Sequence, residues 1–115
     1  MSKSLFSKII DREIPADIVY EDNEIISFKD INPAAPIHIL IVPKKVIPTL
    51  NDLDDKDDYK LIGKMFKVAQ KLAKDNNLSV SGFRTVFNCN EDGGQTVYHL
   101  HLHLLGGRQF QWPPG

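Results

Sequence analysis

Hydrophobic and polar residues alternate strictly in one stretch near the end of the sequence, from Tyr98 to Gly107. His99, His101 and His103 occupy every second position, and leucines fill the positions between them. Successive side chains of a β-strand point to opposite faces, so a strand would gather the three imidazoles on one face and the leucines on the other. A helix would spread the same side chains around its axis. The pattern therefore predicts a strand with a functional histidine face, which we favour over a solvated polar face.

Hydrophobic periodicity also predicts two helices. Apolar residues at i, i+1, i+4 and i+5 from Leu5 form one face of a short helix, which Ser2 or Ser4 caps and which ends near Asp11. A longer helix, from Asp58 to Asp75, carries one apolar stripe and has lysines over the rest of its surface. The aspartates that precede it lack the glycine turn and terminal glutamate of a calcium loop, so we interpret them as the helix start.

Four further strands are predicted from β-forming residues and turn signals, at residues 17–20, 24–29, 37–43 and 82–88. The first two form a hairpin, and the third is an apolar run typical of a central strand that is covered on both sides. His38 is the exception in that run. A lone histidine there is more often a hydrogen-bonded core residue than a catalyst, but beside the histidine strand it would buttress one of the three imidazoles.

The loop at residues 90–96 contains two consecutive glycines, Gly93 and Gly94. Paired glycines permit unusual dihedral angles and close approach of the backbone to a ligand. A simple hairpin turn is the plain alternative. The position of the loop directly before the histidine stretch favours the ligand-binding interpretation.

Composition limits the remaining possibilities. The 115 residues predict one domain, 1–115, and 14 Lys and Arg against 15 Asp and Glu give a formal charge of −1, which offers little support for nucleic-acid binding. The single cysteine, Cys89, cannot form an internal disulfide, which suits a reducing compartment. The sequence lacks an apolar run of membrane-spanning length and the long apolar core of a signal peptide. We expect a soluble intracellular protein without a nucleic-acid or membrane partner.

The histidine stretch, His99 to Leu105, resembles the signature of the histidine triad family. The preceding segment Asp92-Gly93-Gly94-Gln95-Thr96-Val97-Tyr98 and the ending Trp112-Pro113-Pro114-Gly115 resemble one branch of that family, the histidine triad nucleotide-binding proteins. These are purine nucleoside phosphoramidases, also called protein kinase C interacting proteins. The likeness extends over nearly the whole chain.

The resemblance implies an α+β fold with a five-stranded antiparallel sheet, one short helix and one long helix. It implies a homodimer in which two sheets join into one of ten strands. The implied activity is hydrolysis of the P–N bond of AMP-linked or GMP-linked amines, and of acyl-adenylates, without a metal or other cofactor. The implied compartment is the cytoplasm, with the nucleus as a further one.

The resemblance also implies a role for each site residue. His101 would be the nucleophile that takes the nucleotidyl group, and His38 and His99 would support it from behind. The phosphate would contact Asn88, Gly94, Gln95, Thr96 and His103. The ribose and base would contact Asp30, Ile31, Phe6, Ile9 and Leu40. Trp112 would reach across the dimer to the partner's site.

The chemistry can also be argued from the residues alone. A neutral imidazole, with an unperturbed pKa of about 6.5, is a good nucleophile near pH 7. For one nitrogen of His101 to stay unprotonated, the other needs a hydrogen-bond acceptor, and we expect a backbone carbonyl near His99. The proton donor to the leaving group stays open between Thr96, His103 and a relay through His38 and His99.

Three rival functions remain. Histidines two residues apart on a strand can share a zinc ion, but we see no nearby carboxylate or cysteine suited to complete the shell. A nucleotide-binding scaffold protein with little turnover would keep the pocket without using a nucleophile. Hydrolysis of dinucleoside polyphosphates is the third, and Gly106-Gly107 with the Trp-Pro-Pro-Gly ending favours the phosphoramidase instead.

Overall fold

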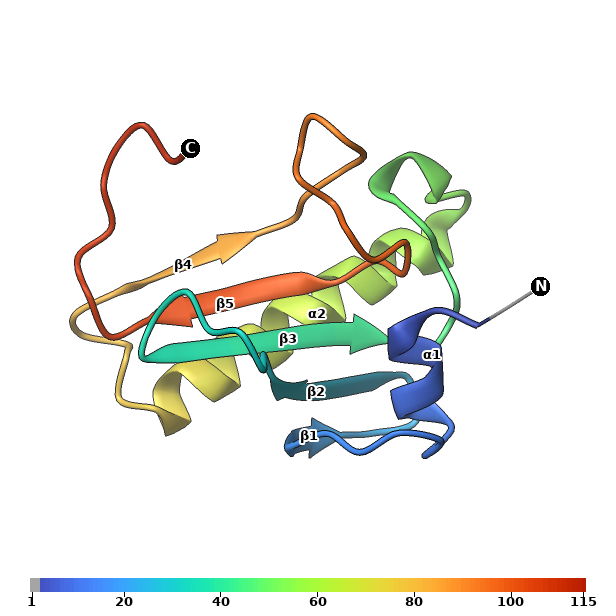
Figure 1. Cartoon of the computed structure of the whole chain (residues 1–115), viewed down its shortest axis with the longest axis horizontal. Coiled ribbons are helices and arrows are strands. Elements are labelled where there is room, and N and C mark those ends of the chain that lie inside the picture. The colour runs from blue at the N-terminus through green and yellow to red at the C-terminus, as the bar shows by residue number, and fades with distance from the viewer. Residues whose placement is uncertain (1–2) are drawn as a thin grey trace.

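The computed structural model describes residues 3–115, so the proposed cap at Ser2 lies outside the described residues. The elements are α1 (Leu5–Ile10), β1 (Ile18–Glu21), β2 (Ile25–Lys29), β3 (Ile37–Pro43), a 3-10 turn (Leu50–Asp52), α2 (Lys56–Asp75), β4 (Phe83–Val86) and β5 (Leu102–Gly106). The strands form one antiparallel sheet in the order β1-β2-β3-β5-β4 (Figure 1). The predicted α+β fold with five antiparallel strands is confirmed. No helix within residues 3–115 is both long enough and apolar enough to cross a membrane.

The long helix α2 begins two residues earlier than the sequence pattern predicts. Asp55 is its N-cap, and the Asp55 carboxylate accepts a hydrogen bond from the Asp58 N–H at 3.0 Å. This cap satisfies a backbone donor that would otherwise lack a partner, which is why the helix starts at Lys56. Past the C-terminal end, Asn77 adopts a left-handed conformation with φ of 61°, as the asparagines there predict.

The strand β3 lies in the middle of the sheet, between β2 and β5, and is covered on both faces. Ile39 and Ile41 join the core under α2, whereas Leu40 and Val42 join a second core with α1. Figure 1 shows the two helices on opposite sides of the sheet, with α1 in front of the end of β3 and α2 behind β3 and β5. The predicted central strand is confirmed.

The histidine strand is shorter than predicted, because β5 begins at Leu102 and not at Tyr98. Two hydrogen bonds at the end of β3 and beyond it take the place of ladder pairing for the preceding residues. The His99 side chain donates to the Pro43 carbonyl at 2.7 Å, and the Leu100 N–H donates to the Ile47 carbonyl at 2.7 Å. The chain stays extended through this stretch, so alternation survives: the leucines at 100, 102 and 104 all lie in the core under α2. The strand predicted at 82–88 is likewise shorter and ends at Val86.

Candidate active site

A cleft of about 320 Å³ lies between α1, the end of β2 and the histidine stretch. Eight of the residues assigned to the site by resemblance line it: Phe6, Ile9, Asp30, Ile31, Leu40, Thr96, His101 and His103. Eight further lining residues are not among those assigned, and most of them are apolar and carry no motif of their own: Leu5, Ile14, Pro15, Ala16, Phe28, Lys29, Asn32 and Val97. The cleft is therefore an apolar pocket with a polar end, where two imidazoles and a carboxylate meet.

His101 is held in one protonation pattern by the backbone. Its Nδ1–H donates to the His99 carbonyl at 2.8 Å, so in the neutral ring Nε2 is the nitrogen that carries a lone pair. The ring is 8% exposed, and burial lowers its pKa below the ordinary value. Phe6 of α1 packs edge-on against the ring, with centroids 4.9 Å apart. The expectation of a backbone carbonyl acceptor near His99 is confirmed.

His99 is completely buried behind His101. Its Nε2–H donates to the Pro43 carbonyl at 2.7 Å, which leaves Nδ1 as an acceptor. The Oγ atoms of Ser4 and Ser7 both lie 3.3 Å from that Nδ1. Burial lowers the pKa of His99, so the neutral ring is the favoured form.

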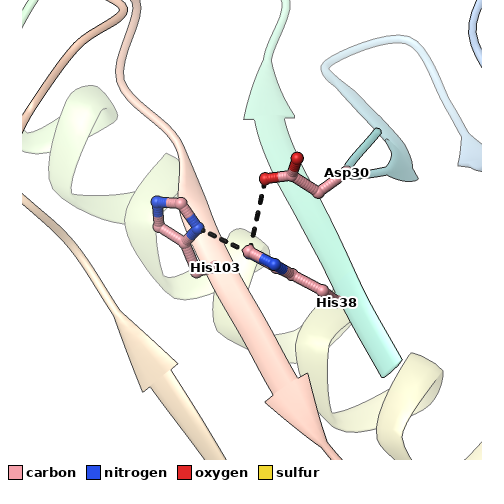
Figure 2. A group of neighbouring side chains, drawn as sticks. All are labelled: Asp30, His38 and His103. Atoms are coloured by element: carbon pink, nitrogen blue, oxygen red, sulfur yellow. Dashed lines mark hydrogen bonds and ion pairs between the residues drawn. The ribbon is translucent and has the colours of Figure 1, made fainter. Parts of the chain in front are cut away.

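His38 and His103 form a second pair, which Figure 2 shows beside Asp30. The Ala34 N–H donates to Nδ1 of His38 at 3.0 Å, so the His38 proton lies on Nε2. That Nε2–H donates to Nδ1 of His103 at 2.9 Å, which in turn places the His103 proton on its own Nε2. The two strands β3 and β5 bring the pair together, with Leu40 paired to His103 in the ladder.

The Nε2–H of His103 is a buried donor without a partner among residues 3–115. His103 lines the cleft, and burial together with the neighbouring histidines lowers its pKa to about 4. A buried donor that lacks an acceptor costs free energy, so such atoms in native proteins ask for an explanation. An oxygen of a bound ligand would satisfy it.

The expected support of His101 by both His38 and His99 is corrected by these contacts. His99 does support His101, through its carbonyl group. His38 instead hydrogen-bonds to His103, and its Nε2 lies 3.5 Å from an Asp30 carboxylate oxygen. The sequence could show that β3 and β5 carry histidines, but the register that decides their pairing is a property of the folded sheet.

The loop before the histidine stretch is closed by Gln95. Its buried side chain accepts from the Asn90 N–H at 2.9 Å and donates to the Pro48 and Val97 carbonyls at 2.8 and 3.1 Å. The backbone N–H groups of Gly94 and Gln95 donate to the carbonyls of Glu91 and Asn90. The next residue, Thr96, differs: its backbone N–H donates to no backbone carbonyl of the described residues. The N–H groups of Gly94 and Gln95, which we expect to contact the phosphate, thus already have backbone acceptors.

Two other residues assigned by resemblance lie outside the cleft. Asn88 follows β4 and is half-buried, and Trp112 in the C-terminal tail is 82% exposed. Their assigned contacts stay predictions.

A metal ion can be considered at Asp30, His38 and His103, whose ligand atoms lie within 4.8 Å of one another. The view that no carboxylate lies near the histidines is therefore wrong, because folding brings Asp30 to them. The hydrogen bonds nevertheless disfavour a metal. His38 would have to give up its Nε2 proton, while its Nδ1 already accepts from the Ala34 N–H and has no room for that proton. The residues fit a chain of hydrogen bonds better than a set of metal ligands.

Comparison with known proteins identifies the family. The family model described as "Scavenger mRNA decapping enzyme C-term binding" matches residues 3–111. An uncharacterised HIT-like protein from Synechocystis is 51% identical over 112 residues, which cover 97% of this chain and 96% of that protein. A purine nucleoside phosphoramidase from Escherichia coli K12 is 51% identical over 106 residues, covering 92% of this chain and 88% of that protein.

The solved structures agree with the sequence relatives. A HIT family hydrolase from Legionella pneumophila superposes with a TM-score of 0.94 at 55% identity, covering 98% of this chain and all of the other. A histidine triad protein from Clostridium difficile superposes with a TM-score of 0.90 at 42% identity, covering 96% of this chain and 97% of the other. With the histidines arranged as described and relatives similar along almost their whole lengths, this chain belongs to the histidine triad (HIT) family.

Proposed function

We propose that this protein is a purine nucleoside phosphoramidase that hydrolyses the P–N bond of AMP-linked or GMP-linked amines, and acyl-adenylates. The observation that carries the proposal is the unprotonated Nε2 of His101, held in a cleft beside the unpartnered Nε2–H of His103. A nucleophile and a donor for an anionic oxygen are thus adjacent. The 51% identity to the Escherichia coli protein named for this activity supports the same assignment.

In the first step, Nε2 of His101 attacks the α-phosphorus and the bond from phosphorus to the amine breaks. A nucleotidyl-histidine forms, and the departing nitrogen gains a proton. The Thr96 hydroxyl and the His103 Nε2–H are the donors that the cleft supplies for that proton. In the second step, water attacks the phosphorus and returns a proton to the group that protonated the amine, the bond to Nε2 breaks and the mononucleotide leaves. Two easier displacements replace one hard step.

Charge develops on the phosphoryl oxygens in both steps. The His103 Nε2–H has no partner among the described residues and Thr96 lines the cleft, so the His103 Nε2–H and the Thr96 amide would donate to these oxygens; one such donor is worth about 3–4 kcal/mol of transition-state stabilisation. The apolar walls from α1 and β2 would take the purine, and Asp30 at the cleft edge would accept from ribose hydroxyls. The lowered pKa of His101 keeps the nucleophile neutral at pH 7.

The test is His101→Ala, assayed with adenosine 5′-phosphoramidate. Hydrolysis should fall by about three orders of magnitude or more, because the variant has no nucleophile. Circular dichroism and AMP binding, measured by calorimetry, should remain close to wild type. Wild-type protein quenched during turnover should carry a nucleotidyl adduct on His101 by mass spectrometry. Turnover by the variant at the wild-type rate would reject the nucleophile, and AMP binding without any wild-type turnover would favour a nucleotide-binding scaffold.

We also propose that the protein is a homodimer that joins two sheets into one of ten strands. β4 lies at an edge of the sheet, where unpaired backbone groups are available to another strand. Phe83 on β4 and Phe66 on α2 are large apolar side chains that are 42% and 44% exposed. Sedimentation analysis should give a dimer for the wild type and a monomer for Phe83→Glu, whereas a monomeric wild type would contradict the proposal.

A further inference from the structure

His99 is a buried histidine that takes no direct part in the proposed reaction. It is 0% exposed, yet both ring nitrogens have partners: Nε2–H donates to the Pro43 carbonyl, and Nδ1 faces two serine hydroxyls. Because a carbonyl can only accept, the proton must lie on Nε2. Nδ1 must then accept, and the hydroxyls of Ser4 and Ser7 are the groups that can donate to it.

The two serines come from the first turn of α1. Ser4 is its N-cap: Ser4 Oγ accepts from the Ser7 N–H at 3.0 Å and donates to Ser7 Oγ, which leaves the Ser7 hydroxyl proton for Nδ1 of His99. Ser7 Oγ lies 3.2 Å from Ser4 Oγ and 3.3 Å from Nδ1 of His99. From the sequence, Ser4 is expected only as a helix cap and Ser7 has no expected role, since His99 is more than 90 residues away from both.

His99 connects this turn to the nucleophile. The His99 carbonyl accepts from Nδ1–H of His101 at 2.8 Å, and this bond selects the reactive tautomer of His101. The His99 ring and this carbonyl belong to one residue, so the hydrogen bonds that hold the ring also restrain the backbone that carries the carbonyl. The same helix also places Phe6 against the His101 ring. One short helix thus contacts the nucleophile directly and through His99.

We propose that Ser4 and Ser7 are positioning residues for His101, because their hydroxyl groups hold His99 in the tautomer protonated only at Nε2 and so fix the carbonyl that orients the nucleophile. The inference rests on the proposed function in taking His101 as the nucleophile. It adds that the first turn of α1, beyond lining the cleft, sets the protonation pattern on which the reaction depends.

The two serine hydroxyls affect the pKa of His99, because they favour one protonation form of its ring. Donors to the Nδ1 lone pair stabilise the neutral ring, so removing them makes protonation easier and raises the pKa of His99. The titratable group next to His99 is His101, whose pKa the charge of His99 lowers. Lys3, next to Ser4, is paired at the surface with Asp11 and Glu13. Protonated His99 would place a positive charge beside His101 and weaken it as a nucleophile.

The experiment compares two double variants, Ser4→Asp with Ser7→Ala and Ser4→Asn with Ser7→Ala. They differ only at residue 4, where one has a carboxylate oxygen and the other an amide NH₂ group. Asp and Asn are both good N-caps, and Ala is a good helix former, so α1 should be equally stable in both. Only the Asn amide can donate to Nδ1 of His99 while its oxygen caps the helix. The Asp carboxylate can only accept, so it favours a proton on Nδ1.

With adenosine 5′-phosphoramidate, the Asn variant should keep the wild-type pH profile and a kcat within about threefold of wild type. The Asp variant should lose about tenfold in kcat at pH 7, equivalent to about 1.4 kcal/mol, with KM little changed. Its acid limb should move to higher pH by about one unit or more. Imidazole ¹⁵N NMR should show Nδ1 of His99 unprotonated at pH 7 in the wild type and Asn variant, and protonated in the Asp variant.

Equal kcat values and equal pH profiles for the two variants would overturn the proposal, and so would unchanged His99 nitrogen shifts in the Asp variant. If the Asp variant fails to fold, Ser7→Ala alone gives the answer. It keeps the cap, and it should raise the NMR-measured pKa of His99, whereas an unchanged pKa counts against the role of the hydroxyl. Failure of the proposed function would appear separately, as absence of turnover in the wild type, with the NMR comparison still deciding the tautomer.

Discussion

Ser27 on β2 is a buried hydroxyl that brings a cost rather than a function. It is 0% exposed, and its Oγ has no hydrogen-bond partner among the described residues. Burying an unsatisfied hydroxyl costs about 1–3 kcal/mol. Ser27→Ala should therefore raise the free energy of unfolding by about 1 kcal/mol, measured by urea denaturation, and leave hydrolysis unchanged.

Thr49 is the matched control for that substitution. It is also buried, but its hydroxyl accepts from the Asn51 N–H at 3.1 Å and donates to an Asp52 carboxylate oxygen at 2.9 Å. Thr49→Ala should lower the free energy of unfolding by about 1 kcal/mol, as for loss of an N-cap. Destabilisation of the same size by both substitutions would show that Ser27 is satisfied in solution.

The four histidines predict how stability depends on pH. All have pKa values lowered mainly by burial, and that of His103 falls from 6.5 to about 4. Between these values the unfolded chain binds more protons than the folded chain, so the free energy of unfolding falls as the pH falls. Urea denaturation from pH 7 to pH 4.5 should show this decrease, and His103→Gln should reduce it. Most carboxylates titrate below this pH range. The pKa of Glu21, for example, is lowered from 4.5. A free energy of unfolding that stays constant across this pH range would contradict the lowered pKa values of the histidines.

At the scale of elements, the sequence predicts what periodicity encodes and misses what long-range hydrogen bonds decide. Alternation identified the histidine face and the leucine face, and both are present. The predicted start of β5 is wrong, because the true start depends on the hydrogen bond from the Leu100 N–H to the Ile47 carbonyl, which no local pattern reveals. Gln95 is assigned to the phosphate by resemblance, and that contact stays a prediction; the structure adds that its side chain closes the loop, which no local pattern indicates.

The glycine loop gives a prediction that belongs to this element. A Cβ on Gly93 would lie 2.5 Å from the Cys89 carbonyl oxygen and 2.7 Å from the Cys89 nitrogen, and both are backbone atoms that cannot move without opening the loop. Gly93→Ala should lower stability by about 1–3 kcal/mol. It should also lower kcat/KM by about tenfold or more, because the loop carries Thr96 to the cleft. Urea denaturation and steady-state kinetics measure the two effects.

Gly63 in α2 serves as the control for Gly93. A Cβ there would meet no atom within 4 Å, and the residue lies inside a helix. Gly63→Ala should stabilise the protein by up to about 1 kcal/mol and leave kinetics unchanged. If Gly93→Ala behaved in the same way, the tight closure of the loop would have no role in catalysis.

At the scale of the whole molecule, the C-terminal tail is fixed beside the free edge of the sheet. The Arg84 side chain on β4 donates to the Gln111 carbonyl at 2.9 Å, and the Arg84 and Arg108 guanidinium groups lie 5.0 and 4.2 Å from the centre of the Phe110 ring. Figure 1 shows the tail rising beside β4, away from α1. Trp112 follows this anchor and is 82% exposed, outside the cleft of its own subunit. A fixed tail that ends in an exposed indole at the proposed dimer edge suits a contact with a second subunit.

Trp112→Ala should therefore impair the partner's site selectively. An indole offers a large apolar surface for a bulky leaving group, so kcat/KM for an aryl-amine adenylate should fall about tenfold. The value for adenosine 5′-phosphoramidate, which releases ammonia, should change by less than about threefold, and the dimer should persist.

Mixing the Trp112→Ala protein with the His101→Ala protein makes the test decisive. In a mixed dimer, the only intact His101 lies in the Trp112→Ala subunit and faces the intact Trp112 of the other. Activity on the aryl-amine substrate should return on mixing, whereas a tryptophan that serves its own subunit would leave the mixture as impaired as its parts.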